Sequence, residues 1–261
     1  ALSASQFSSL APAIIGSLRV EQVNSLSSIE LSSMTSAQAQ RLTAAQLASL
    51  SAYQLGALNS DSLASLSAPQ IAAISPAAIS GLTSDQISKL GDQGISYFTA
   101  PQFGGLLGSQ LQTFTPAQLA RIDGSRIIGL TPSALGALTA AQFAQLSPDA
   151  IGHLQPSQLS VLTSTQVKAL TPAQVRELTG AQIGGLNAQQ VGDISPAALS
   201  AFSQSQLAAI RPEAFPGLMS DQIQLLGSVG VSYLSSAQLN KLVGSQLTSR
   251  SEERRVGKEC L

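Results

Sequence analysis

The sequence repeats every eight residues, without one insertion or deletion, over 31 consecutive units from residue 3 to residue 250. Each octad follows the pattern Ser/Thr–Pro/Ala–x–Gln–Leu–x–x–Leu, as in residues 115–122 and 171–178. Position 5 of the octad is apolar in every unit, and position 8 is apolar in 30 of the 31. A strict short period indicates one small structural element stacked many times, so the function is expected on a surface.

The spacing within the octad favours a helix. Positions 5 and 8 differ by a step of three, which places them on one helix face, whereas a strand requires steps of two. Position 1 is Ser or Thr in 19 octads and position 4 is Gln in 20, which together form the capping-box pattern. Proline is favoured at the first helical residue and ends the preceding helix. Nine of the 12 prolines occupy position 2, namely Pro12, Pro76, Pro116, Pro132, Pro148, Pro156, Pro172, Pro196 and Pro212.

These features predict an all-α solenoid, or superhelix, with one very short capped helix per octad. Such a helix is far shorter than the ~12–15 residues needed for marginal stability alone, so positions 5 and 8 must be buried against other octads. Positions 6 and 7 are mostly Ala, Gly or Ser, which lets backbones approach closely, and Gln and Ser are expected on polar edges. The competing architecture is a β-solenoid with two or three octads per coil. The number of octads in a superhelical turn does not follow from the pattern.

The two ends of the chain differ from the array in different ways. Residues 250–261 abandon the octad pattern, are rich in charge, and resemble the in-frame translation of a common sequencing adapter. We therefore expect two parts, an octad solenoid over residues 1–249 and a non-native tail over residues 250–261. Ala1 and Leu2 fit positions 7 and 8 of a preceding octad, which suggests an interior fragment of a longer array. The single cysteine, Cys260, lies in the tail, so the array offers no thiol for a disulfide or a metal.

A longer period of 17 octads overlies the first. Residues 83–114 and residues 219–250, which are 136 positions apart, are identical at 15 of 32 positions. Each segment contains an unusual octad, residues 91–98 and 227–234, with Gly at positions 1 and 4 and Tyr at position 7. Two octads later, Leu107 and Val243 occupy the cap position. Two interpretations remain open: an inherited local change of curvature, or a recurring partner-binding patch at Tyr97 and Tyr233.

The search for chemical groups identifies no catalytic, cofactor or metal site. His153 is the only histidine, and it lies four residues after Asp149, as expected for a surface pair on one helix face. Acidic residues occur singly, and no calcium-loop, phosphate-loop or zinc spacing is present. Residues 1–249 carry nine Lys or Arg against eleven Asp or Glu, so no basic stripe favours nucleic acid. No stretch approaches the roughly 18 apolar residues of a membrane span.

The octads resemble the Leu-Thr-x-x-Gln-(Leu/Val)-x-x-Leu tracts of very large bacterial exported, adhesin-like repeat proteins, as in residues 138–146 and 162–170. The resemblance covers residues 3–249 and implies a bacterial secreted or cell-surface context, but it transfers no site residues. We therefore expect a non-enzymatic structural spacer or stalk that acts without cofactors. The alternative is a protein-binding scaffold with contacts near Tyr97 and Tyr233. Exposed positions are mostly Ser, Ala, Gly and Gln, which favours the spacer.

Overall fold

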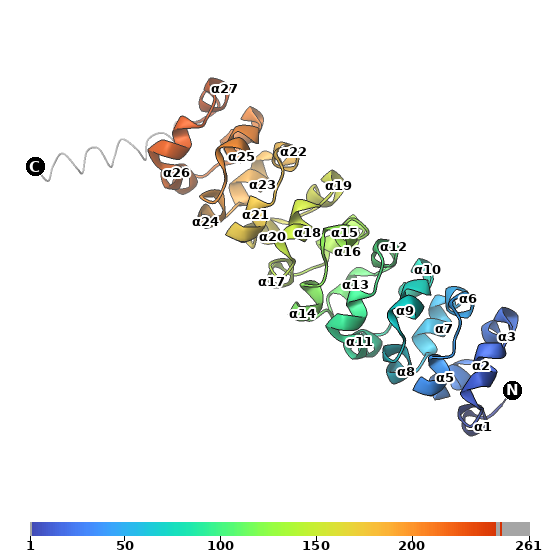
Figure 1. Ribbon diagram of the computed structural model, residues 1–261. Coiled ribbons are helices and arrows are strands. Elements are labelled where there is room, and N and C mark those ends of the chain that lie inside the picture. The colour runs from blue at the N-terminus through green and yellow to red at the C-terminus, as the bar shows by residue number, and fades with distance from the viewer. Residues whose placement is uncertain (1, 244–245, 247–261) are drawn as a thin grey trace, which may run out of the picture. The chain divides into compact units, whose positions relative to one another are not determined.

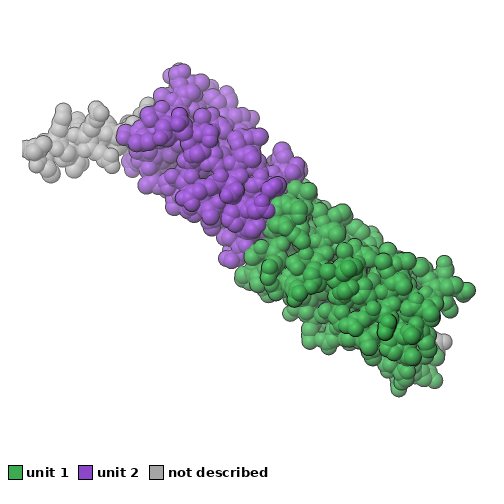
Figure 2. Space-filling view, in the orientation of Figure 1, with its two compact units in different colours: residues 1–138 green, residues 139–261 purple. Residues whose placement is uncertain are grey.

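The chain folds entirely through short helices. The computed structural model describes residues 2–243 and 246, which fall into two compact units, Ala1–Leu138 and Thr139–Leu261 (Figure 2). Every regular element in this part of the chain is a helix, and Figure 1 shows their succession. The all-α prediction is therefore confirmed for the described residues, and the β-solenoid alternative is wrong. The predicted non-native tail, residues 250–261, lies outside the described residues.

Most helices have four to six residues and occupy one octad each. The first unit contains α1 (Ala4–Ser8), α2 (Pro12–Ser17), α3 (Val20–Asn24), α4 (Ser28–Ser33), α5 (Ser36–Ala39), α6 (Ala44–Ala48), α7 (Ala52–Ala57), α8 (Ser60–Ala64), α9 (Ala68–Ala73), α10 (Pro76–Ile79), α11 (Ser84–Ser96), α12 (Ala100–Gly104), α13 (Gly108–Leu111), α14 (Pro116–Leu119), α15 (Gly124–Ile127) and α16 (Pro132–Gly136). The second unit contains α17 (Ala140–Phe143), α18 (Pro148–Gly152), α19 (Pro156–Leu159), α20 (Ser164–Lys168), α21 (Pro172–Arg176), α22 (Gly180–Gly185), α23 (Ala188–Asp193), α24 (Pro196–Leu199), α25 (Gln204–Ala209), the 3₁₀ helix η1 (Pro212–Gly217), α26 (Ser220–Ser232) and α27 (Ser236–Leu239).

The capping boxes form as predicted. At the start of α21, Thr171 adopts an extended backbone, with φ −82° and ψ 157°. Its Oγ1 accepts the Gln174 backbone N–H at 3.2 Å, and its own N–H donates to Gln174 Oε1 at 2.9 Å. Pro172 occupies the first helical residue, where the missing N–H leaves no bond unmade. Two of the donors that every short helix would otherwise leave free are thus satisfied within the octad.

Three elements depart from one α-helix per octad. The unusual octads form their own short helices, but each is joined directly to the preceding helix, so α11 and α26 each span 13 residues as two helical segments that meet at a kink. Gly91 and Gly227 sit at these kinks with φ 63°, a conformation that side chains disfavour. The third exception is η1, which contains Pro216 and is a 3₁₀ helix. The prediction of one short helix per octad therefore holds at these places too, with two pairs of helices joined at a glycine kink and one helix of the 3₁₀ type.

Positions 5 and 8 form the core. The position-5 residues Leu47 and Phe103 are completely buried, and the position-8 residues Leu50 and Leu106 are 3% and 2% exposed. Each helix packs against a helix about three elements further along the chain, such as α2 against α5 and α6 against α9 in the first unit. The second unit repeats this arrangement in α18 with α21 and α22 with α25. Stacked octads therefore bury one another's apolar pairs, which the isolated helices could not do.

The glutamine at position 4 joins each octad to the one four units earlier. Nε2 of Gln86 donates to the carbonyl oxygens of Leu55 and Leu58, at 2.7 and 2.8 Å. Its Oε1 meanwhile accepts the Thr83 backbone N–H of its own capping box, at 2.9 Å. Residues bonded in this way are 28 and 31 positions apart, or 3.5 and about 3.9 octads, so a superhelical turn takes between three and four octads.

We call this series of interactions the glutamine ladder. Its members in the first unit are Gln38, Gln46, Gln54, Gln70, Gln86, Gln102, Gln110 and Gln118. Its members in the second unit are Gln174, Gln182, Gln190, Gln206, Gln222, Gln238 and Gln246. Gln38 and Gln102 are completely buried, so the expectation that position-4 glutamines line polar edges is wrong. These amides are buried because both of their ends are bonded to backbone.

Small residues at positions 6 and 7 let neighbouring turns touch through their backbones, as predicted. A Cβ atom on Gly81 would lie 1.8 Å from the carbonyl oxygen of Ala52, and one on Gly217 would lie 1.8 Å from that of Ala188. Both glycines are at position 7 and meet position 2 of an octad three units earlier. A side chain at either glycine would force these turns apart. The small residues of the octad therefore set the distance between neighbouring turns.

Candidate binding surfaces

The two predicted partner-binding tyrosines occupy equivalent places in the two units. Tyr97 follows the kinked helix α11 and Tyr233 follows α26, and both are half-buried. The Tyr97 hydroxyl accepts a hydrogen bond from Gln93 Nε2 at 2.8 Å, on its own helix. Because they belong to different units, the two tyrosines are described as two separate patches. The partial burial of both side chains and the local hydrogen bond of Tyr97 fit a structural role beside the kink.

The apolar cap residues that follow each kink are exposed. Leu107 is 50% exposed and Val243 is 45% exposed. Gln110 Oε1 still accepts the Leu107 backbone N–H at 2.8 Å, so half of the capping box survives without a hydroxyl. These two residues add apolar surface to the same segment of each repeat of the longer period.

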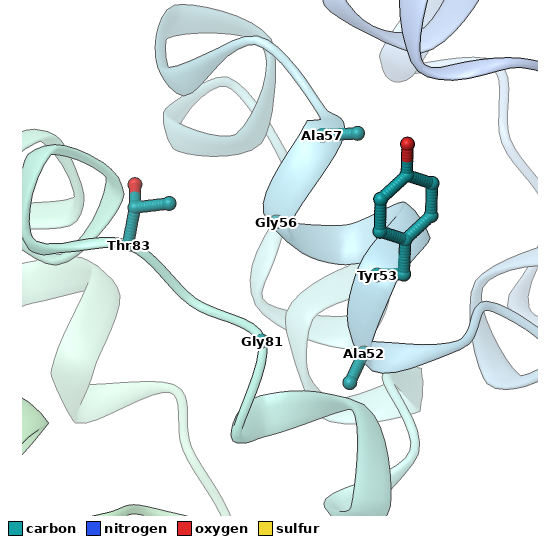
Figure 3. A pocket seen from close by; sticks show the side chains of 6 residues that line it. All are labelled: Ala52, Tyr53, Gly56, Ala57, Gly81 and Thr83. Atoms are coloured by element: carbon teal, nitrogen blue, oxygen red, sulfur yellow. The ribbon is translucent and has the colours of Figure 1, made fainter.

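Sequence reasoning missed the most exposed tyrosine. Tyr53 on α7 is 72% exposed and borders a cavity of about 350 Å³, which Figure 3 shows between α7 and the segment that follows α10. Gly56 and Gly81 form its floor, where their backbones meet too closely for a side chain. Ile29, 62% exposed, lies on α4, which packs against α7. The available signal was an aromatic residue at position 3 of an otherwise regular octad.

A second missed feature is a buried acid in the second unit. Asp193, at position 7 of its octad and at the end of α23, is only 8% exposed. Lys168 Nζ lies 3.4 Å from its Oδ1, while its Oδ2 is buried and accepts no hydrogen bond among the described residues. Asp193 borders two cavities of about 220 and 290 Å³. A buried carboxylate with an unsatisfied oxygen is costly, so it marks this place as unusual within the repeat.

Several other charged groups form isolated surface pairs. Arg121 donates to Asp92, with its Nη2 2.7 Å from Oδ2, and this bond lowers the pKa of the Asp92 carboxyl below its usual value. His153 Nδ1 lies 3.3 Å from Asp149 Oδ1, and both side chains are exposed, as predicted for a surface pair. Such pairs provide no general acid or base positioned in a cleft.

Arg126 replaces glutamine at position 4 and takes over its role. Its Nε donates to the Phe98 carbonyl oxygen at 3.2 Å and its Nη2 to that of Ser96 at 2.7 Å. The N-cap residue Asp123 pairs with the same guanidinium. Burial raises the pKa of Asp123, but the Ser125 hydroxyl and the Arg126 charge outweigh it, and the pKa is lowered overall. Both the cap and the ladder are thus preserved with charged groups.

Residues 2–243 and 246 contain neither a metal-ligand cluster nor a membrane-spanning helix. Within this range there is no group of three or more His, Cys, Asp or Glu side chains that could hold a metal ion. None of the described helices is long and apolar enough to span a membrane. Comparison of the chain with family models and with curated proteins finds no match.

Proposed function

We propose that this chain is a non-catalytic structural repeat, a spacer or stalk of a large bacterial surface or secreted, adhesin-like protein. The observation that supports it is the glutamine ladder, because the same bonds recur from Gln38 to Gln118 and from Gln174 to Gln246. Each regular octad adds one helix, and each ladder glutamine adds one set of bonds in the same register. The number of octads then sets the length, and no single octad carries the function.

Deletion of one longer period tests the spacer proposal. Removing residues 83–218 joins Leu82 to Met219 and takes out 136 residues, or 17 octads, without changing the register. Small-angle X-ray scattering of both chains gives their maximum dimensions. A spacer shortens in proportion to the octads removed, whereas a compact globule changes only as about the 0.38 power of chain length. A maximum dimension that falls only as about the 0.38 power of chain length would contradict the proposal.

The second candidate is a protein-binding scaffold that contacts its partner near Tyr97 and Tyr233. Exposed aromatic surface favours it, above all Tyr53 at 72% exposure beside a cavity. Tyrosine is among the residues that dominate binding energy at interfaces. Replacing Tyr53, Tyr97 and Tyr233 together by serine separates the candidates. Loss of an identified partner with an unchanged scattering profile favours the scaffold, and an unchanged partner affinity excludes these tyrosines.

A further inference from the structure

The strongest unexplained feature of the chain is the Asp193 carboxylate. Most other octads place exposed charges or small residues at position 7, such as the half-exposed Lys89 and Arg121 or the glycine Gly81. Asp193 instead lies under the surface with Oδ2 unbonded, and its one cationic neighbour, Lys168, has a side chain that is 59% exposed. Leaving a buried acceptor unsatisfied destabilises a protein, and such local costs concentrate at functional sites.

The two cavities at Asp193 differ in character. The smaller is lined by hydroxyl and amide groups, including Ser160, Thr163 and Asn187. The larger is lined by apolar groups, among them Pro196 and the 54% exposed Met219. Asp193 borders both, so one ligand can lay an aliphatic stem in the larger cavity and present a polar end to the carboxylate.

The charge around the cavities selects the ligand. Asp193 and Asp221 contribute two carboxylates, and Lys168 contributes one ammonium group, so the charged lining is net negative by one. A cationic donor offsets this negative charge and gives the carboxylate a closer donor than Lys168, whose Nζ lies 3.4 Å from Oδ1. Lys168 is mostly exposed and holds Oδ1 only at 3.4 Å, so it can be displaced.

We propose that the Asp193 site binds a lysine or arginine side chain of a partner protein. The ammonium or guanidinium group pairs with the Asp193 carboxylate, and the methylene stem packs on Met219 and Pro196. A flexible thioether suits this contact because methionine adapts to irregular surfaces. This assignment goes beyond the spacer function and does not depend on it, because a strut can carry one binding site along its length.

Methionine methyl resonances provide the test. The chain has two methionines, Met219 at the site and Met34, which is 2% exposed in the first unit and serves as the internal reference. The full chain, labelled with ¹³C at the methionine methyl groups, is titrated with Nα-acetyl-lysine N-methylamide. We expect the Met219 signal to shift and saturate while the Met34 signal stays in place. The norleucine derivative, which lacks the ammonium group, is expected to leave both signals unchanged.

Variants assign the effect to the carboxylate. Asp193→Asn keeps the shape and is expected to weaken lysine binding at least about tenfold. Lys168→Ala removes the resident competitor and is expected to tighten it, whereas Asp149→Asn, an exposed acid of the same unit, leaves it unchanged. Should Asp193→Asn fail to fold, judged by circular dichroism, Asp221→Asn provides the second weakening variant.

Several results would overturn the proposal. They are a Met219 signal that does not move with the lysine derivative, one that moves equally with the norleucine derivative, and binding that survives in folded Asp193→Asn. A Met219 shift with methyl glycosides but not with the amine would assign the site to carbohydrate instead. Unchanged affinity in Lys168→Ala would contradict displacement of that ammonium group.

Discussion

The residue on which this fold depends most is a glutamine used at both ends. In Gln102, Oε1 accepts the Thr99 backbone N–H at 2.9 Å, and Nε2 donates to Ile71 and Ile74 carbonyl oxygens at 2.7 and 2.8 Å. The side chain is completely buried. No shorter amide could span the two backbones, and no carboxylate could donate to the second one.

The variant Gln102→Glu therefore keeps the hydrogen-bond acceptor of the side chain and removes its donor. The carboxylate keeps the cap but faces two carbonyl oxygens, so we expect a loss of unfolding free energy on the order of 3 kcal/mol at neutral pH. Burial raises the pKa of the introduced glutamate above its unfolded value of about 4.3. The protonated glutamate is tolerated, so the loss of unfolding free energy should be small below about pH 4.3. The loss should grow as pH rises from there through the folded pKa. Chemical denaturation at several pH values measures it.

The matched control is Gln204→Glu, which introduces the same charge at an exposed residue of α25. It is expected to change stability by no more than about 0.5 kcal/mol, because surface substitutions away from buried networks have small effects. Equal effects of the two variants would contradict a special role for the ladder glutamine.

Glu30 is the natural carboxylate at position 4, and it has the opposite pH dependence. Hydrogen bonds from the backbone N–H and the hydroxyl of Ser27, each 2.8 Å long, lower the pKa of Glu30. A lowered folded pKa contributes stability above the unfolded value of about 4.3, and this is lost as pH falls through the folded pKa. We expect Glu30→Gln to remove that part of the acid sensitivity, measured by denaturation from about pH 2 to pH 7. An unchanged pH profile would contradict the assignment.

At the scale of the element, the two kinked helices depend on glycine conformation alone. A Cβ on Gly91 would meet no atom within 4 Å, yet its φ of 63° disfavours any side chain. Gly91→Ala is therefore expected to cost about 1–3 kcal/mol of unfolding free energy through backbone strain. Gly185→Ala, in α22, also meets no atom within 4 Å, and its φ is not positive. It is expected to be neutral or stabilising by up to about 1 kcal/mol. Thermal and chemical denaturation compare the two, and similar costs would contradict backbone strain at Gly91.

Element formation could be predicted from the sequence because its determinants lie within one octad. The cap residue Thr171, the ring of Pro172 and the apolar residue Val175 are sufficient to define α21. The superhelical turn could not be predicted, because the bond from Gln174 to Leu146 joins residues 28 apart. The capping box alone accounts for a glutamine at position 174. The bonds that Gln174 makes to another octad therefore leave no separate signal in the sequence.

The candidate sites were predictable to a smaller extent. Tyr97 and Tyr233 stood out because their octads are irregular, and their surroundings now show partial burial. Tyr53 and Asp193 lie in regular octads, and their environments come from other turns. Asp193 is buried because Lys168 and Ser164, three octads earlier, lie beside it. Burial at position 7 thus depends on stacking, which the sequence period does not reveal.

At the scale of the whole molecule, the register of eight should matter more than the number of residues. Deleting residues 163–170 removes one octad and leaves every later glutamine facing equivalent carbonyl groups. We expect that variant to fold with the full helical circular dichroism per residue. Deleting residues 163–166 removes half an octad and misaligns Gln174 and Gln182 with their acceptors. We expect lost helicity and a lower unfolding temperature, and equal stability of the two variants would contradict the ladder.

The direction of the ladder affects how such a chain acquires its structure. Each ladder glutamine donates toward the N-terminus, to carbonyl groups no more than 31 residues behind it. A segment leaving a ribosome therefore finds the acceptors of its ladder glutamines already synthesised. Since the longest of these links is constant, relative contact order declines as octads are added, and low contact order accompanies fast folding. Lengthening the array by duplication consequently imposes no kinetic penalty on its assembly.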